Sequence, residues 1–372
     1  MATQRRRREV VVGIFLLITA VLVDSAQART SLTLSDKSNN IEFARASRGT
    51  VKTIQMKSSF LDEGESHLQG LPAELEEWGV DCPEGTVPII RKTSENVPDI
   101  KDYVPSFFVD DVKSLHNKSF PVFASYNKGH EYAVVQTIGK GTFRGGQAIH
   151  NVWTPHTETG EASISQIWIY AGPDETVNTV EAGWAVDASS GTSRFFTYWT
   201  SDGYKSSGPG FVQTSKYYGP GSTISSTSTY NGKQFEINIQ IRQDLSTQHW
   251  WLRLNDMDIG YWPGSIFNSL RGGADGVYWG GEIYNSEKNG QHTTTQMGSG
   301  HFPRDGYYTK SSFIRNLAYI LNNGPMQPVP KAALVTYVSK PQCYDLVMGP
   351  SGLNFGTHFY FGGPGLSSQC PK

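Results

Sequence analysis

The chain has 372 residues and a formal net charge of −2, from 32 basic and 34 acidic side chains. This balance excludes the concentrated basic surface that nucleic-acid binding requires, so we expect no nucleic-acid partner. Hydrophobic residues make up 37% of the chain and aromatic residues 12%, and glycine occurs 39 times. These proportions allow a sizeable core and favour short strands joined by tight turns.

The first 28 residues have the three parts of a secretory signal peptide. Residues 5–8 are all arginine, residues 10–23 are apolar, and Ala26 and Ala28 form a small-residue cleavage pattern. A nuclear-localisation patch and a membrane anchor are the alternatives, but the apolar stretch is shorter than the about 20 residues that cross a bilayer. We therefore predict a secreted, extracellular protein, with an acidic vacuole-type compartment as the alternative, and without stable membrane insertion.

Residues 29–128 differ in composition from residues 129–372, being polar at first and then acidic and rich in proline. Residues 71–79 predict a short helix, residues 81–85 a turn and residues 87–91 a strand. Asn117 lies in an Asn-Lys-Ser sequon and is a predicted glycosylation site. The expected organisation is a signal peptide (1–28), a small propeptide domain (29–128) and a main domain (129–372).

The chain contains three cysteines, Cys82, Cys343 and Cys370. In an oxidising compartment, one disulfide and one remaining thiol is the simplest expectation. A bond between Cys343 and Cys370 would hold a C-terminal segment that would otherwise fray. A bond from Cys82 to either of them is the alternative, because the sequence alone leaves the connectivity open.

Strand patterns dominate the chain after about residue 130. The clearest is residues 234–242, where apolar and polar residues alternate. Asn231-Gly232 precedes it as a hairpin-turn signal, and residues 250–254 read as the returning strand. Further strands are expected at residues 164–170, 179–186, 194–200 and 277–284. Because so many antiparallel strands must cover their faces and edges, we predict an all-β fold with an antiparallel β-sandwich main domain.

Three motif-like features fit no known chemistry. The glycine-rich residues 139–145 lack the GxGxxG spacing and precede no helix, so they predict a turn. Ser201 and Ser299 do not form a G-x-S-x-G elbow. His292 and His301 lack the spacing of metal-binding motifs and are expected to be solvated or core residues. We therefore expect no metal and no cofactor.

Two glutamates lie in predicted strands with a glycine two residues away. Glu181 shares its strand face with Gly183, and Glu282 shares its face with Gly280. Glycine weakens a strand but permits close approach of another backbone, as a peptide lying over a carboxylate requires. On spacing alone, two ordinary solvent-facing glutamates are the more common reading.

Several strings of aromatic residues and glycine stand out in the main domain. They are EAGW at 181–184, FTYWTSDGY at 196–204, GFVQ at 210–213, WGGE at 279–282, QMGSGHF at 296–302 and the tail from Cys343 through FGGPG at 361–365 to Cys370. These strings resemble motifs of the neprosin family of plant glutamic peptidases. In addition, residues 81–88 resemble the activation-peptide motif of that family, and the resemblance covers most of residues 50–372.

The resemblance implies a β-sandwich peptidase made as a zymogen and inhibited by its own propeptide. It places the catalytic pair on Glu181 and Glu282, and it implies cleavage of peptides or proteins on the carboxyl side of proline. Two features depart from the family pattern. The loop at residues 204–209 lacks a cysteine pair, and Cys82 lacks the usual upstream cysteine.

A pair of close carboxylates implies general acid–base hydrolysis, because one of them is held protonated while the other ionises. Activity is then expected in acid, and the sequence leaves open which glutamate is the acid. Gln166 is a candidate oxyanion donor, although a solvent-facing glutamine is as common. Candidates to line a proline pocket, although such residues are more often core, are Trp184, Tyr198, Tyr278 and Trp279.

Other readings remain open from the sequence. A non-catalytic secreted sandwich could bind carbohydrate or cell-wall material through its aromatic side chains, and binding to insoluble polysaccharide without the two glutamates would favour it. A glycosidase could use the same pair of carboxylates, and it would cut sugars rather than peptides. A family member with an altered cleft is a third. The acidic propeptide also suggests that acid releases it from the main domain.

Overall fold

The computed structural model describes residues 50–53, 58–59, 84, 86–89, 129–139, 141–173, 176–205, 210–286, 291–350 and 355–370. In this part of the chain the regular structure is β-strand with a few 3-10 turns, so the all-β prediction is confirmed. The signal peptide, the helix at 71–79, Cys82 and Asn117 lie outside the described residues. No helix within those ranges is long and apolar enough to cross a membrane.

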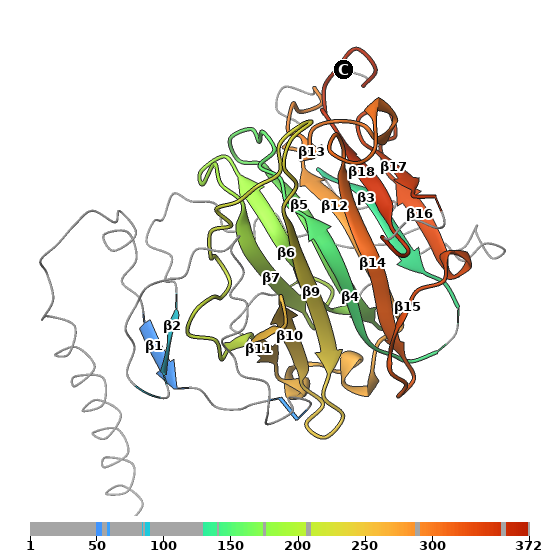
Figure 1. Ribbon diagram of the computed structural model, residues 1–372. Coiled ribbons are helices and arrows are strands. Elements are labelled where there is room, and N and C mark those ends of the chain that lie inside the picture. The colour runs from blue at the N-terminus through green and yellow to red at the C-terminus, as the bar shows by residue number, and fades with distance from the viewer. Residues whose placement is uncertain are drawn as a thin grey trace, which may run out of the picture. The chain divides into compact units, whose positions relative to one another are not determined.

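Two antiparallel sheets pack face to face to form the main body (Figure 1). The smaller sheet contains six strands, in the spatial order β16 (Leu334–Val338), β3 (His130–Thr137), β12 (Gly276–Tyr284), β5 (Ala162–Ala171), β6 (Asn178–Asp187) and β7 (Arg194–Thr200).

The larger sheet contains ten strands, and in Figure 1 it lies in front of β5, β6 and β12. Its main path runs through β13 (Met297–Gly298), β18 (Phe359–Gly363), β14 (Ser312–Leu321), β4 (Phe143–Asn151), β9 (Glu236–Gln243), β10 (Trp250–Leu254), β11 (Met257–Trp262) and β8 (Val212–Gln213). Two further strands pair at its side, β15 (Met326–Pro328) with β14 and β17 (Asp345–Met348) with β18. The 3-10 turns are η4 (Gly264–Ile266), η5 (Leu270–Gly272), η7 (Pro303–Asp305) and η8 (Lys331–Ala333).

The strands predicted from two-residue alternation are present. Residues 234–242 correspond to β9, whose residues are buried at every second position, and residues 250–254 are the antiparallel partner β10. The glycine-rich residues 139–145 are only partly a turn, because β4 begins at Phe143. The turn prediction was therefore wrong for the second half of that segment, where β4 needs only an extended backbone and partners on both sides.

The hydrophobic core lies between the two sheets. The smaller sheet contributes Val180, Ala182 and Trp184 from β6, and the larger sheet contributes Ile237 and Ile239 from β9. Since side chains alternate along a strand, the odd-numbered residues of β6 point to the other face of the smaller sheet. That second face is also buried, because β5, β6 and β12 are covered almost completely along their length.

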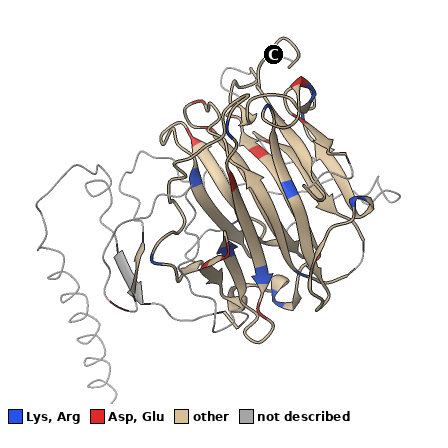
Figure 2. Ribbon diagram, in the orientation of Figure 1, with Lys and Arg blue, Asp and Glu red and all other residues tan. Residues whose placement is uncertain are grey.

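Lysine, arginine, aspartate and glutamate residues are scattered over the strands rather than gathered in one region (Figure 2). One partly buried pair joins Arg315 of β14 to Glu236 of β9, with 2.6 Å between nitrogen and oxygen. This distribution agrees with the balanced composition of the chain.

Short described segments of the predicted propeptide contact the larger sheet. β1 (Thr50–Thr53) pairs with β2 (Thr86–Ile89). Gln213 of β8 donates to the backbone oxygen of Pro88 at 3.0 Å. Ser58 donates to Asp258 of β11 at 2.6 Å. These bonds hold parts of the propeptide range against β8 and β11.

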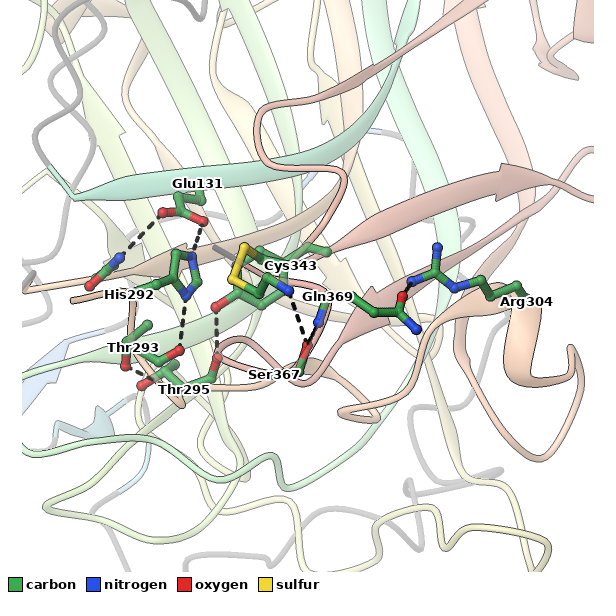
Figure 3. Close-up of a disulfide and its surroundings, with 11 residues drawn as sticks. Glu131, His292, Thr293, Thr295, Arg304, Cys343, Ser367 and Gln369 are labelled. Atoms are coloured by element: carbon green, nitrogen blue, oxygen red, sulfur yellow. Dashed lines mark hydrogen bonds and ion pairs between the residues drawn. A yellow bond between two sulfur atoms is a disulfide. The ribbon is translucent and has the colours of Figure 1, made fainter. Parts of the chain in front are cut away.

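Cys343 and Cys370 form a disulfide, which is the pairing that the C-terminal segment led us to expect (Figure 3). Both cysteines are buried, and the loop that they close contains the paired strands β17 and β18. β18 in turn places Phe361 against Gly281 of β12, the residue next to Glu282. The disulfide therefore stabilises the packing beneath one of the two predicted catalytic strands.

Replacing both cysteines by alanine is expected to lower the free energy of unfolding by about 3–4 kcal/mol, because a loop of this length loses much conformational entropy when it is closed in the unfolded chain. Urea unfolding of the double variant beside the wild type measures this loss. Wild-type protein treated with a reductant is the matched control and should show the same loss. Equal midpoints and slopes for oxidised and reduced protein would contradict the prediction.

Candidate active site

Glu181 and Glu282 lie on the same face of the smaller sheet, on the two strands that flank β5. In β5, Glu282 is opposite Ile164 and Glu181 is opposite Trp168. Gln166 lies between these two positions, so the glutamates approach it diagonally from either side. Both glutamates and Gln166 are completely buried, and neither glutamate is the solvent-facing residue that spacing alone favoured.

Two glycines flank Gln166 in the sheet. Gly280 and Gly183 are the direct neighbours of Gln166 on β12 and β6. A methyl group on Gly183 would lie 1.9 Å from the backbone oxygen of Ser165, and one on Gly280 would lie 2.4 Å from that of Ala133. Because a side chain at either position would collide with the backbone of the neighbouring strand, both positions require glycine.

Glu282 has three hydrogen-bond donors around its carboxylate. His130 Nδ1 lies 2.7 Å from Oε1, and the two side chains are almost fully buried. The hydroxyl of Tyr132 donates more weakly to the same oxygen, at 3.4 Å. Gln166 Nε2 donates to Oε2 at 3.0 Å. Every oxygen of Glu282 thus accepts at least one hydrogen bond, which favours the ionised form.

Glu181 has a one-sided set of partners. The hydroxyls of Thr179 and Tyr204 both donate to Oε1, each at 2.6 Å. Oε2 is buried and has no hydrogen-bond partner in the described part of the chain, and the same holds for Oε1 of Gln166. A carboxylate oxygen that is buried without a hydrogen-bond donor is costly, because its negative charge is not stabilised. The protonated, neutral acid costs less to bury, so this environment favours it.

The two carboxyl groups differ in acidity for these reasons. Burial raises the pKa of Glu181 from 4.5 to about 8, helped by the charge of Glu282 and opposed by the bonds from Thr179 and Tyr204. Burial also raises the pKa of Glu282, but the bond and charge of His130, with the bonds from Gln166 and Tyr132, pull it down. The pair can therefore share one proton, with Glu181 the better site for it.

The aromatic candidates divide between the two faces of the sheet. Tyr198 is the neighbour of Glu181 on β7, and Tyr278 lies on the face of Glu282, so both are on the side of the two glutamates. Trp184 and Trp279 are fully buried in the core between the sheets. The prediction that these tryptophans line a substrate pocket was wrong, because each is an odd number of residues from its glutamate and points to the opposite face.

Four further residues contact the glutamates and were absent from the candidates chosen from the sequence: His130, Tyr132, Thr179 and Tyr204. Thr179 lies two residues before Glu181 and so shares its face, which was a usable signal. His130 and Tyr132 are about 150 residues from Glu282 in the chain and meet it only because β3 pairs with β12. No local sequence pattern predicts a contact between residues so far apart in the chain.

His292 lies in a different cluster, beside the disulfide (Figure 3). Its Nδ1 bonds the backbone oxygen of Thr293 at 3.0 Å and its Nε2 bonds Glu131 at 2.9 Å. Burial alone would lower the pKa of His292, but the bond and the charge of Glu131 together with the bond to Thr293 outweigh burial and raise the pKa. One ligand atom from each of His292, Cys343 and Cys370 lies within 4.8 Å of the others, yet both sulfurs are used in the disulfide.

The solved structures that resemble this chain include three of peptidases. Two are scytalido-glutamic peptidase, one with a peptide-based transition state analog (12% identity, 63% of this chain and 97% of that one, TM-score 0.31) and one with a transition state analog inhibitor (11%, 62% and 97%, 0.35). The third is SCP-B, a member of the eqolisin family of peptidases, with the tripeptide Ala-Ile-His (9%, 63% and 97%, 0.31). Likenesses this distant assign no role to any residue here.

A family model gives a more direct result. The model named Neprosin matches residues 159–364, a range that includes both Glu181 and Glu282. It also includes Gln166 and Tyr204. Because the match extends over more than half of the 372 residues, the protein belongs to the neprosin family.

Proposed function

We propose that this protein is a secreted glutamic endopeptidase, made as a zymogen, that works in acid and cleaves peptides on the carboxyl side of proline. Membership of the neprosin family supports the glutamic-type peptidase. The observation that carries the proposal is the buried pair Glu181 and Glu282, which share one face and have unequal partners. Such a pair supplies a base and an acid at the same pH.

Glu282 acts as the general base in this proposal. Its three donors favour the carboxylate, and His130 supplies positive charge when its ring is protonated. The carboxylate takes a proton from a water molecule, and the water oxygen attacks the carbonyl carbon of the scissile peptide bond. Because water attacks the carbonyl carbon directly, the reaction needs no covalent intermediate with the enzyme.

Glu181 acts as the general acid. With its pKa raised to about 8, it keeps its proton through the acidic and neutral range. It gives that proton to the amide nitrogen as the carbon–nitrogen bond breaks. Glu181 is then a carboxylate and Glu282 carries the proton from water, so one proton must return from Glu282 to Glu181 before the next cycle.

Gln166 supports the developing oxyanion. Its Nε2 carries two N–H bonds, and one of them donates to Glu282. The second can donate to the oxygen that becomes negatively charged when water attacks. Gln166 lies between the two glutamates in the sheet, which is the position such a donor needs.

Tyr198 and Tyr278 are the aromatic residues that could receive the proline ring of the substrate. Tyr198 packs with Phe196 on the side of Glu181, and Tyr278 packs with Tyr132 and Trp168 on the side of Glu282. Flat aromatic faces suit a rigid apolar ring. Inhibition by the propeptide is part of the same proposal, with the contacts of Pro88 and Ser58 as its described anchors.

After acid incubation, the secreted protein is expected to cleave a peptide with one central proline after that residue, and the intact protein is expected to leave this peptide uncleaved. Activity should rise as Glu282 ionises and fall as Glu181 loses its proton near pH 8. Assays from about pH 3 to 9, with products identified by mass spectrometry, measure both limbs. A matched peptide with alanine in place of proline tests the preference, and the double variant Glu181→Gln/Glu282→Gln is the inactive control.

Each outcome bears on a different part of the proposal. Equal cleavage of both peptides would remove the proline preference and keep the peptidase. No shortened form after acid incubation would remove acid activation. No cleavage of any peptide, together with equal binding of wild type and double variant to insoluble polysaccharide, would replace the peptidase by a carbohydrate-binding sandwich.

A further inference from the structure

The turn after β7 brings one tyrosine back over the face of the smaller sheet. Tyr204 contacts both aromatic clusters of that face, the one at Tyr198 and the one at Tyr278. Its ring stacks on Tyr198, with 5.9 Å between centroids and 11° between planes. Its hydroxyl lies 2.6 Å from Oε1 of Glu181 and 3.2 Å from Oγ1 of Thr179. Tyr204 is thus held at both ends, by its ring and by its hydroxyl.

The backbone of this turn is held in an uncommon conformation. Tyr204 has a φ of 64°, in the left-handed region that bulky residues rarely adopt. Its N–H donates to Oγ1 of Thr200 at 2.9 Å, the N–H of Lys205 donates to Asp202 at 3.1 Å, and the N–H of Gly203 donates to the oxygen of Val177 at 3.0 Å. A strained residue held in place by surrounding bonds is a signature of functional sites.

We propose that Tyr204 is a positioning residue which, together with Thr179, keeps the transferable proton of Glu181 on Oε2. This inference rests on the proposed peptidase function. Two short hydrogen bonds occupy the lone pairs of Oε1, whereas Oε2 has no donor among the described residues. An acid proton on Oε1 would compete with both donors, so it resides on Oε2. That oxygen is therefore the one that gives its proton to the leaving nitrogen.

The two hydroxyls on Oε1 also influence the pH profile. Within the described ranges, the titratable groups facing Glu181 include Tyr204 from the turn, Tyr198 from β7, Glu282 from β12 and Tyr132 from β3. Bonds from Tyr204 and Thr179 stabilise the carboxylate left after proton transfer, and they lower the pKa of Glu181 against the effect of burial. Loss of either hydroxyl should thus weaken catalysis and also move the alkaline limb upward.

Tyr204→Phe keeps the ring and removes the hydroxyl. It is expected to lower kcat about 10-fold or more, to leave KM nearly unchanged and to move the alkaline limb upward by about one pH unit. Thr179→Val should shift the limb in the same direction, and Thr179→Ser should recover most of what Thr179→Val loses. Tyr319→Phe, in the core beside Phe143, is the matched control for loss of a buried tyrosine hydroxyl.

An infrared titration of the protonated carboxyl of Glu181, with Glu181→Gln to assign the band, reads the same shift without any substrate. An unchanged titration and an unchanged profile in Tyr204→Phe would overturn the inference. A lower kcat without a shift of the infrared titration or of the pH profile would mean that Tyr204 acts only through packing, and this result would also overturn the inference. Absence of peptide cleavage by the wild type, in contrast, would be a failure of the proposed function, and the infrared titration would still show whether Tyr204 controls the proton of Glu181.

Discussion

Glu282→Gln is expected to reduce kcat for peptide hydrolysis by about 10³-fold or more at every pH, because an amide cannot take the proton of the attacking water. Glutamine has nearly the same size, and it can still accept from His130 and Tyr132 at the positions that Glu282 uses. The fold should therefore survive, which circular dichroism and an unfolding midpoint check. Residual activity within tenfold of the wild type would contradict a base role for Glu282.

Glu181→Gln is expected to lose activity in a way that depends on the leaving group. A peptide nitrogen needs a proton to leave, so hydrolysis of the proline peptide should fall by about 10²–10⁴-fold. An aryl ester of the same peptide has a leaving group that departs without a proton, and most of its hydrolysis should remain. Glu282→Gln is the matched comparison, because the base is needed for both substrates. Equal losses on ester and peptide in Glu181→Gln would contradict the acid role of Glu181.

The second large effect concerns the pH dependence of stability. Two buried groups, Glu181 and His150, are expected to change the free energy of unfolding in opposite directions as pH rises. Burial raises the pKa of Glu181 from 4.5 to about 8. The pKa of Glu181 is higher in the folded state than in the unfolded state. Its contribution to the free energy of unfolding is therefore complete below about pH 4.5 and is lost as pH rises to about 8. A shift of this size corresponds to on the order of 5 kcal/mol. The raised pKa of Glu282 acts in the same direction.

His150 of β4 has the opposite effect. It is completely buried, with Nδ1 3.1 Å from the hydroxyl of Ser165, and burial lowers its pKa from 6.5 to about 3. Since the unfolded state binds the proton more tightly, the contribution of His150 to stability is complete above about pH 6.5. It is lost as pH falls towards 3, by on the order of 5 kcal/mol. Stability should therefore be greatest between about pH 4.5 and 6.5, where the slopes of His150 and Glu181 cancel.

Free energies of unfolding, measured by urea denaturation from pH 3 to 9, test this balance. We compare each variant with the wild type, because the contributions of the other carboxylates are the same in both and cancel in the difference. Relative to wild type, His150→Leu should gain stability as pH falls below 6.5, and Glu181→Gln should gain it as pH rises above 4.5. Ser165→Ala controls for loss of the serine–histidine bond. Parallel curves for His150→Leu and wild type would show that the buried imidazole is not a source of acid lability.

Several structural features were predictable from local pattern. Alternation of apolar and polar residues, with a turn signal before them, predicted β9, and the aromatic-rich residues 250–254 predicted the returning strand β10. The same period placed Glu181 on the face opposite Trp184, with Gly183 beside it. Local pattern suffices here because a side chain's face depends only on its position along its own strand.

The approach of the two glutamates was not predictable in this way. Glu181 and Glu282 lie about 100 residues apart in the chain, and they flank Gln166 only because β6 and β12 both pair with β5. Spacing favoured solvated glutamates, whereas the second face of the sheet is buried as completely as the first. The tryptophan candidates failed for a related reason, because closeness in sequence to a glutamate does not place a residue on its face.

The sequence by itself determined the strand periods, the all-β class and the identity of the two glutamates, because alternation and motif strings are properties of neighbouring residues. Only the tertiary structure shows how the surroundings of the two carboxyl groups differ. That difference comes from His130 and Tyr204, whose contacts with Glu282 and Glu181 depend on strand pairing and on a strained turn. Acidity in a buried site is set by the donors that surround each oxygen, and those donors are brought together by the fold.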